Sequence, residues 1–124
     1  MPPTSRQRAG RLGEEAAVRW YLAHGFGLVA RNWRCRAGEL DVIVRRGRLV
    51  VFCEVKSRSG PRFGAPEEAV TRSQQRRIRA AAAAFLHVMR TDPGWAKPAR
   101  VRFDVVCVRP GPSGLSVSVV EEAF

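Results

Sequence analysis

The sequence predicts a mixed α/β fold, in which two helices flank a mixed β-sheet. Two segments with helical periodicity lie on either side of three segments rich in Val, Ile and Phe. A further Val-rich segment follows the second helix, and the length of 124 residues suits one domain. We therefore expect a single domain over residues 1–124, with the element order α-β-β-β-α-β and one more strand at its end.

The first helix is expected over residues 5–24. Thr4 and Gln7 have the spacing of a capping box, in which each side chain bonds the backbone N–H of the other residue. Gly25 supplies the stop signal, because glycine readily adopts the left-handed conformation that ends helices. A strand over residues 26–33 follows.

The next two strands are expected to form an antiparallel hairpin over residues 40–45 and 49–56. Both are rich in Val and Ile, and Gly47 lies between them. A basic turn over residues 34–38 precedes the hairpin, and a loop with two Gly and two Pro follows it over residues 57–66.

The second helix is expected to run from a capping box at Thr71 and Gln74 to about Arg90. A short helical turn over residues 66–68 precedes it, because a proline followed by two acids favours a helix start. The apolar stripe of the helix repeats at helical spacing and consists of Ile78, Ala82, Phe85 and Met89.

Two strands over residues 101–108 and 115–120 complete the expected sheet. The strand after the second helix can run parallel to its neighbour, because a helical crossover returns the chain to the same end of the sheet. The sheet is therefore expected to be mixed.

The charge balance predicts a polyanionic partner. The chain has 22 basic and 11 acidic residues, which gives a net charge of +11 at pH 7. Small domains this basic usually bind nucleic acid, although a merely cationic surface would have the same composition. No apolar run is long enough to span a membrane and no GxxxxGK(S/T) phosphate loop occurs, so neither a membrane nor ATP is expected as a partner.

The cysteines predict a reducing, cytoplasmic environment. Cys35, Cys53 and Cys107 are odd in number, widely spaced and never arranged as CxxC. Cys53 and Cys107 lie in apolar runs, as reduced core cysteines do, and a cysteine-ligated zinc site is not expected. The basic first residues are followed by no apolar run, so no secretory signal is expected.

Acidic residues lie inside the apolar hairpin. Side chains alternate along a strand, so Glu39 and Asp41 share one face of the first strand, as Phe52 and Glu54 do in the second. A two-residue turn at Arg46-Gly47 would place Asp41 opposite Phe52 and Glu39 opposite Glu54, which puts the three acids on one face. A three-residue turn would put Asp41 and Glu54 on opposite faces.

The clustered carboxylates predict a metal site. Like charges repel and burial adds to their cost, whereas a bound divalent cation removes both problems. Oxygen ligands without His or Cys suit Mg²⁺ or Mn²⁺. The alternative is a set of solvated hairpin salt bridges. Lys56 lies beside the acids and is one of only two lysines among the 22 basic residues, which favours a role that needs a compact ammonium with an adjustable pKa.

The hairpin resembles a known nuclease pattern. Gly38-Glu39-Leu40-Asp41, followed after twelve residues by Glu54-Val55-Lys56, is similar to the PD-(D/E)XK motif. More closely, the chain resembles the YraN-type family of proposed endonucleases over residues 10–108. The matching segments are 10–14, 31–34, 52–56, 63–66 and 102–106. The resemblance implies the restriction-endonuclease-like fold, an αβββαβ core with a mixed central sheet flanked by two helices.

The resemblance also implies roles for the hairpin residues. Asp41 and Glu54 would ligate Mg²⁺ or Mn²⁺ together with the backbone carbonyl of Val55, and Glu39 is a candidate for an additional ligand. Lys56 would orient or deprotonate the attacking water, or stabilise the charge that develops on the phosphoryl group.

Glu14 is the acid expected to face the site from the first helix. It lies on an apolar stripe with Ala17 and Tyr21, and the resemblance points the same way. The alternative is an acid that only stabilises the start of the helix through the helix dipole. Glu15 has Arg19 four residues later, which predicts a surface ion pair.

The candidate phosphate contacts are arginines in loops beside the site, namely Arg34, Arg36, Arg58 and Arg62. Taken singly, each is also explained as solvated surface. Gln74 stands where the family usually has Lys; its amide can still bond a phosphate, but a charge there is lost. Arg72, Arg76, Arg77 and Arg79 crowd the second helix and indicate an electrostatic footprint or an exposed face. Asp104 is expected to pair with an arginine rather than to bind metal.

These expectations converge on a metal-dependent nuclease that hydrolyses phosphodiester bonds. Superfamily analogy favours DNA with a junction, flap or overhang as substrate. The alternative is a non-catalytic nucleic-acid-binding module that keeps the fold, which the Gln74 departure leaves open. A third hypothesis is that the chain is an interaction protein of a larger repair or recombination assembly. A homodimer is expected only by analogy with junction resolvases.

Overall fold

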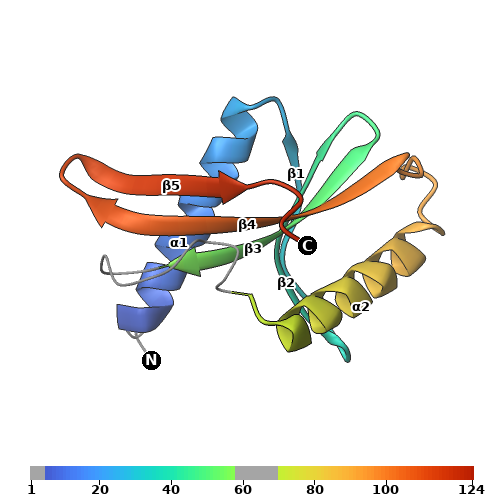
Figure 1. The fold of residues 1–124 in the computed structure, drawn as a ribbon. Coiled ribbons are helices and arrows are strands. Elements are labelled where there is room, and N and C mark those ends of the chain that lie inside the picture. Colours follow the sequence, from blue (N-terminus) through green and yellow to red (C-terminus); the bar gives the residue numbers. More distant parts are fainter. Residues whose placement is uncertain (1–4, 58–69) are drawn as a thin grey trace.

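The computed structural model describes residues 5–57 and 70–124, which form two helices and one five-stranded sheet (Figure 1). The elements are α1 (Ser5–Ala23), β1 (Gly27–Cys35), β2 (Gly38–Arg46), β3 (Leu49–Ser57), α2 (Arg72–Met89), β4 (Arg100–Gly111) and β5 (Gly114–Val120). The predicted order is confirmed. The helical turn predicted over residues 66–68 lies outside the described residues.

The strands lie in the sheet in the same order as in the chain, β1-β2-β3-β4-β5. Neighbouring strands are antiparallel except β3 and β4, which run parallel because α2 carries the chain back between them. One helix covers each face of the sheet (Figure 1). The predicted fold class is confirmed, and this arrangement is consistent with a restriction-endonuclease-like core.

Each face of the sheet has its own apolar core. On the α1 side, Ala17 and Tyr21 are fully buried against valines of β2, β3 and β4. On the α2 side, Ile78 and Phe85 of the predicted stripe are buried against the opposite faces of these strands. Burial on both faces explains why β3 and the middle of β4 read as nearly continuous apolar runs.

The start of α2 follows the prediction. Thr71 is the N-cap, its hydroxyl accepts a hydrogen bond from the Gln74 backbone N–H at 3.1 Å, and the Thr71 backbone N–H donates to Gln74 Oε1 at 2.9 Å. This capping box satisfies two backbone groups that would otherwise lack partners at the helix start. It fixes the end of α2 that lies against the acidic hairpin.

The turn between β2 and β3 differs from the predicted one. Arg46 pairs with Leu49, so the two-residue turn consists of Gly47 and Arg48 rather than Arg46 and Gly47. Gly47 has a φ of 60° and occupies the first turn position, where hairpin turns of type II′ place glycine. The glycine therefore fixes which two residues form the turn.

The predicted pairing of Asp41 with Phe52 is wrong, because Ile43 lies opposite Phe52. Moving the turn by one residue changes the pairing by two, and side chains alternate with a period of two. The prediction of which residues share a face therefore survives, although the individual pairs do not.

Among the described residues, no helix is long and apolar enough to cross a membrane. Cys35, Cys53 and Cys107 are all free thiols, and Cys53 and Cys107 are buried in the core as predicted.

Candidate functional site

The carboxylates of β2 and β3 converge where the regular pairing of these strands ends. The ladder between β2 and β3 runs from the turn to Val42 opposite Cys53. Just beyond this pair, the backbone N–H of Val55 donates to Asp41 Oδ2 at 2.9 Å. The side chain of Asp41 thus accepts a hydrogen bond from the backbone of the neighbouring strand, and the carboxylates of Asp41 and Glu54 lie close together.

These two acids line a small open cavity of about 190 Å³. Its walls come from the start of β2, from β3 and from the first turns of α2, and consist of Gly38, Glu39, Asp41, Glu54, Gln74, Arg77 and Ile78. Glu39, Asp41 and Glu54 all line this cavity, so the three acids share one face of the hairpin as predicted. Gln74, predicted only as a possible phosphate contact, also lines this cavity.

The electrostatics of the cavity disfavour a second negative charge. Burial, and then the nearby charge of Glu54, raise the pKa of Asp41 from its ordinary 3.8 to about 8, although the hydrogen bond from Val55 acts in the opposite direction. Lys56 Nζ lies 3.2 Å from Glu54 Oε1, and both side chains are mostly buried. The ammonium of Lys56 therefore partly balances the negative charge of Glu54.

Glu14 reaches the same region from α1. Its carboxylate Oε1 accepts a hydrogen bond from Asn32 Nδ2 at 3.1 Å and lies 3.7 Å from Arg31 Nη2. Its side chain is only 15% exposed, so the inward orientation predicted for it is confirmed. Its charge also contributes, less strongly than burial and Glu54, to the raised pKa of Asp41.

Glu15 does not pair with Arg19 as the spacing predicted. Arg31 Nη1 donates to Glu15 Oε2 at 3.0 Å instead. Because β1 runs alongside α1, Arg31 reaches both Glu14 and Glu15, and the partner within the helix is not used.

The predicted phosphate contacts have mixed outcomes. Arg34 lies on β1, is largely exposed and pairs with Glu39, with 3.5 Å between Nε and Oε1. Arg36 is exposed between β1 and β2. Arg58 and Arg62 lie outside the described residues. Arg34 and Arg36 are therefore placed at the end of the β1–β2 hairpin that leads into the cavity.

Arg77 is a cavity residue that the sequence alone did not single out. It was predicted only as one of several arginines on the second helix, yet it lines the cavity beside Asp41 and Glu54. Its Cβ lies 3.6 Å from where a Cβ at Gly38 would stand, so the β1–β2 hairpin contacts α2 there. The spacing of Arg77 three residues after Gln74 was the available signal, since residues three apart share a helix face.

Asp104 lies in a separate polar cluster on the α1 side of the sheet. Arg102 donates to both of its oxygens at 2.9 Å, and Tyr21 donates to Oδ2 at 2.7 Å. The backbone N–H of Glu122 donates to Oδ1 at 3.1 Å. The predicted arginine pair is confirmed, and a carboxylate with all these donors has little capacity left for a cation.

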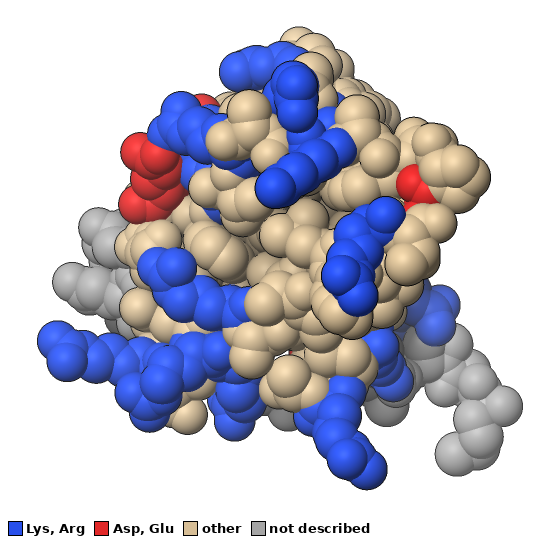
Figure 2. Space-filling view, turned by 90° about the vertical axis from the view of Figure 1, so that its right-hand side faces the viewer, with Lys and Arg blue, Asp and Glu red and all other residues tan. Residues whose placement is uncertain are grey.

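The surface carries a pronounced positive charge. Figure 2 shows many Lys and Arg side chains and few acidic ones on the side of the molecule that lies to the right in Figure 1. The exposed arginines of α2 are Arg72, Arg76, Arg77 and Arg79. Arg79 also lies over the ring of Phe103, 4.9 Å from its centroid, so it contributes to packing as well as to charge.

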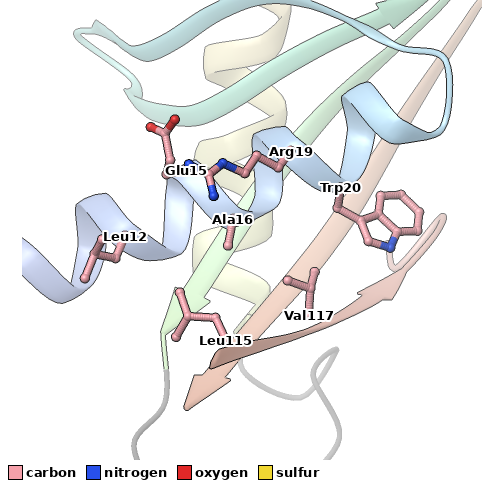
Figure 3. A pocket seen from close by; sticks show the side chains of 7 residues that line it. All are labelled: Leu12, Glu15, Ala16, Arg19, Trp20, Leu115 and Val117. Carbon is pink, nitrogen blue, oxygen red and sulfur yellow. The ribbon is translucent and has the colours of Figure 1, made fainter. Parts of the chain in front are cut away.

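A second concavity, of about 440 Å³, lies between α1 and β5 (Figure 3). It is lined by Leu12, Glu15, Ala16, Arg19, Trp20, Leu115 and Val117. It shares no lining residue with the acidic cavity and brings no two acids together. Its chemistry is that of an apolar groove rather than of a catalytic site.

The acidic cavity fits a hard divalent cation better than a zinc ion. Among the described residues, no three Asp, Glu, His or Cys side chains come close enough to enclose a metal together. The cavity instead offers the carboxylates of Asp41 and Glu54, and its lining contains no His or Cys. Mg²⁺ typically binds one or two carboxylates and keeps water or substrate oxygens as its remaining ligands.

Comparison with known proteins places the chain in a family. The model of the uncharacterised protein family UPF0102 matches residues 13–108. The chain belongs to the UPF0102 family. A UPF0102 protein of Symbiobacterium thermophilum is 43% identical over 119 residues, which are 95% of this chain and 97% of that protein.

Two further UPF0102 proteins cover most of the chain. One from Mycolicibacterium vanbaalenii is 50% identical over 108 residues, which are 86% of this chain and 84% of the relative. Another, from Frankia alni, is 47% identical over 114 residues, which are 92% of this chain and 91% of the relative. The UPF0102 match contains the cavity acids, Lys56 and Glu14.

Proposed function

We propose that this UPF0102 protein is a metal-dependent nuclease of the PD-(D/E)XK type that hydrolyses phosphodiester bonds. One observation carries the proposal: Asp41 and Glu54 converge from adjacent strands, and Lys56 lies beside Glu54 in the same mostly buried region. The resemblance to YraN-type proposed endonucleases supports the same assignment.

The residues in and beside the cavity would have different roles. Asp41 and Glu54, with the carbonyl of Val55, would hold Mg²⁺ or Mn²⁺, and Glu39 would supply an additional carboxylate oxygen. A bound divalent cation supplies Lewis acidity toward a phosphoryl oxygen. The backbone N–H of Val55 holds Asp41 in place through its 2.9 Å hydrogen bond.

Lys56 is the residue suited to the water or to the developing phosphoryl charge. Its ammonium is 3.2 Å from Glu54 and only 17% exposed, so it is held close to the acids. A group held there would orient or deprotonate an attacking water, or donate hydrogen bonds to a more negative transition state. Arg77 lines the same cavity and would supply the positive charge that Gln74 lacks.

The substrate most compatible with the charge is nucleic acid, and by superfamily analogy DNA with a junction, flap or overhang. The net charge of +11 and the basic side of the molecule in Figure 2 support binding to a polyanion. Arg34 and Arg36 at the β1–β2 hairpin would contact phosphates near the cavity. Three free thiols favour a reducing compartment, and we propose the cytoplasm.

The test is a cleavage panel with matched variants. Linear, flapped and four-way DNA, with RNA controls, are incubated with the native protein in Mg²⁺, Mn²⁺ or EDTA. Cleavage is expected only with a divalent cation, and Asp41→Asn and Glu54→Gln should abolish it while retaining nucleic-acid binding. Glu121→Gln removes an exposed carboxylate from another part of the molecule and should cleave normally. Undiminished cleavage by both cavity variants contradicts the proposal.

The second candidate is a nucleic-acid-binding module without catalysis. Gln74 favours it, because its Oε1 accepts the Thr71 backbone N–H and its position provides no charge. A non-catalytic module is expected to show nucleic-acid binding that weakens steeply as salt is added, and no cleavage with any divalent cation. Weak binding of naked DNA together with no cleavage would instead favour an interaction protein of a larger assembly.

A further inference from the structure

Asn32 is a non-glycine residue in the left-handed conformation in the middle of β1, with a φ of 51°. Such residues are uncommon, and they cluster at functional sites because the surrounding structure must hold them. The residues on either side keep one register: Arg31 pairs with Val42 and Trp33 pairs with Leu40. Asn32 is therefore level with Asp41.

The left-handed residue coincides with a switch between the two faces of the sheet. Residues two apart in an extended strand point to the same face. Arg31 nevertheless contacts Glu14 and Glu15 of α1, whereas Trp33 makes an edge contact with Phe85 of α2, with 5.3 Å between ring centroids. Arg31 therefore contacts the helix on one face of the sheet, and Trp33 contacts the helix on the other face.

The partner strand shows the same switch. Val42 belongs to the core on the α1 side, and Leu40 belongs to the core on the α2 side. Asp41 lies between them, opposite the left-handed residue. The change of face in this strand pair is therefore centred on Asp41, the acid that the proposed nuclease uses.

The side chain of Asn32 contacts the second acidic element. Asn32 Nδ2 donates to Glu14 Oε1 at 3.1 Å. Arg31 Nη2 lies 3.7 Å from the same oxygen, and the Glu14 side chain is 15% exposed. Together these contacts hold the carboxylate of Glu14 toward β1 rather than toward solvent.

Close packing of α1 supports this placement. Gly13 is buried, and a Cβ there would lie 2.2 Å from Ser57 Oγ and 3.7 Å from Val55 Cγ1. An alanine would require Ser57 to turn aside or α1 to move away from the end of β3. Glycine at this position lets α1 approach β3 closely, and Glu14 is the next residue.

We propose that Asn32 is a positioning residue, whose amide holds the carboxylate of Glu14 on the β1 side of α1, where its negative charge acts on Asp41 and so strengthens binding of a divalent cation by Asp41 and Glu54. The role rests on the proposed function, since it assigns a support to the same site. Asn32 acts through Glu14 and not on the substrate. Residues that hold metal-site groups in this way typically alter metal affinity roughly 10- to 100-fold when changed.

The experiment measures Mn²⁺ binding to the native chain by electron paramagnetic resonance of free Mn²⁺, without nucleic acid. Asn32→Gly keeps a backbone that adopts positive φ and removes only the amide. It should weaken Mn²⁺ binding roughly tenfold or more without lowering the melting temperature. In a Glu14→Gln background, Asn32→Gly should have no further effect, because the acid it positions is already neutral.

The described part of the chain offers a matched control at another left-handed non-glycine residue. Glu122 has a φ of 50° and pairs with Arg100 at the start of β4, which is level with Leu49 rather than with Glu54. Glu122→Gly should leave Mn²⁺ binding unchanged, and a loss as large as that of Asn32→Gly would overturn the proposal.

Three other results would overturn it as well. They are native Mn²⁺ affinity in Asn32→Gly, an equal loss in the Glu14→Gln background, and no Mn²⁺ binding by the native protein. If the native protein binds Mn²⁺ and Asn32→Gly weakens it, but no substrate is cleaved, the proposed function fails and the positioning role stands. If cleavage occurs and Asn32→Gly binds Mn²⁺ normally, only the positioning role fails.

Discussion

Asp104 and Asp41 lie in the same sheet with opposite surroundings. Asp104 is fully buried, and its oxygens accept hydrogen bonds from Arg102, Tyr21 and the Glu122 backbone. Asp41 is also largely buried, but its neighbours are the Val55 backbone N–H, which donates a hydrogen bond to it, and a second carboxylate, Glu54. Burial alone therefore does not separate a structural acid from a functional one.

The difference lies in what compensates the charge. Donors that surround Asp104 replace the water lost on burial, so its ionised form is stabilised by the protein itself. Around Asp41 the pKa is raised to about 8 by burial and by Glu54, which indicates a carboxylate whose charge is not fully compensated. Protein donors compensate the charge of Asp104, whereas the charge of Asp41 could still be compensated by a bound cation.

The largest expected effect is the loss of folding stability on removing Asp104. Asp104→Ala would leave the buried Arg102 with only the exposed Glu121, 3.7 Å away, as an acidic partner, which costs about 3–5 kcal/mol. Urea unfolding at pH 7 in EDTA would measure it. Asp41→Asn under the same conditions should cost far less or should stabilise the protein, and equal losses in the two variants would remove the distinction between the clusters.

The next effect is stabilisation by metal. Mg²⁺ or Mn²⁺ at 100 times its Kd should raise the free energy of unfolding by about 2.7 kcal/mol, because the cation binds only the native state. Thermal melts with and without the cation would show the shift. Asp41→Asn should abolish it, whereas Glu121→Gln should keep it; a shift retained in Asp41→Asn would place the cation elsewhere.

In the absence of metal, the protonation of Asp41 should make the free energy of unfolding fall by a few kcal/mol as pH rises. Because the pKa of Asp41 is about 8 in the native state and 3.8 ordinarily, the native state holds the proton more tightly. Its stabilising contribution is full below about pH 4 and is lost as pH rises through 8. Comparing urea unfolding of native protein and Asp41→Asn from pH 5 to 9 isolates it, and parallel curves would refute it.

The smallest expected effect comes from trimming the complete cluster by one hydrogen bond. Tyr21→Phe removes the hydroxyl that donates to Asp104 at 2.7 Å and keeps the buried ring. The loss should be about 1 kcal/mol, because the other donors of Asp104 remain. Chemical denaturation at pH 7 would measure it, and a loss as large as that of Asp104→Ala would mean that Tyr21, rather than Arg102, dominates the cluster.

Much of the fold followed from the sequence because it rests on short-range signals. Capping at Thr71 and Gln74, the helical stripe through Ile78 and Phe85, and the Val-rich strands each have a local cause. The convergence of Asp41 and Glu54 was also predictable, since it depends only on the parity of the turn. Which two residues form that turn depended on the backbone of Gly47, and the prediction missed it by one position.

The parts that were not predictable depend on contacts between distant segments. Arg77 joins the cavity because the β1–β2 hairpin meets α2, and Glu15 pairs with Arg31 because β1 lies beside α1. The left-handed backbone of Asn32 lies within a strand-like sequence and has no turn signal around it. The periodicity of a sequence predicts which residues share one face of a single helix or strand. The features above depend instead on contacts between two elements.

The outer edge of β5 has a consequence for behaviour in solution. No described residue pairs with that edge, and β5 contains no charged residue, whereas edge strands are usually guarded by charges. Beside it lies the apolar groove of Figure 3, where Leu115 is 47% exposed. Repulsion between molecules of charge +11 opposes self-association through this edge, and salt screens that repulsion. Rising ionic strength should therefore weaken attachment to a nucleic acid and favour contact between copies, so that one variable separates the two kinds of assembly.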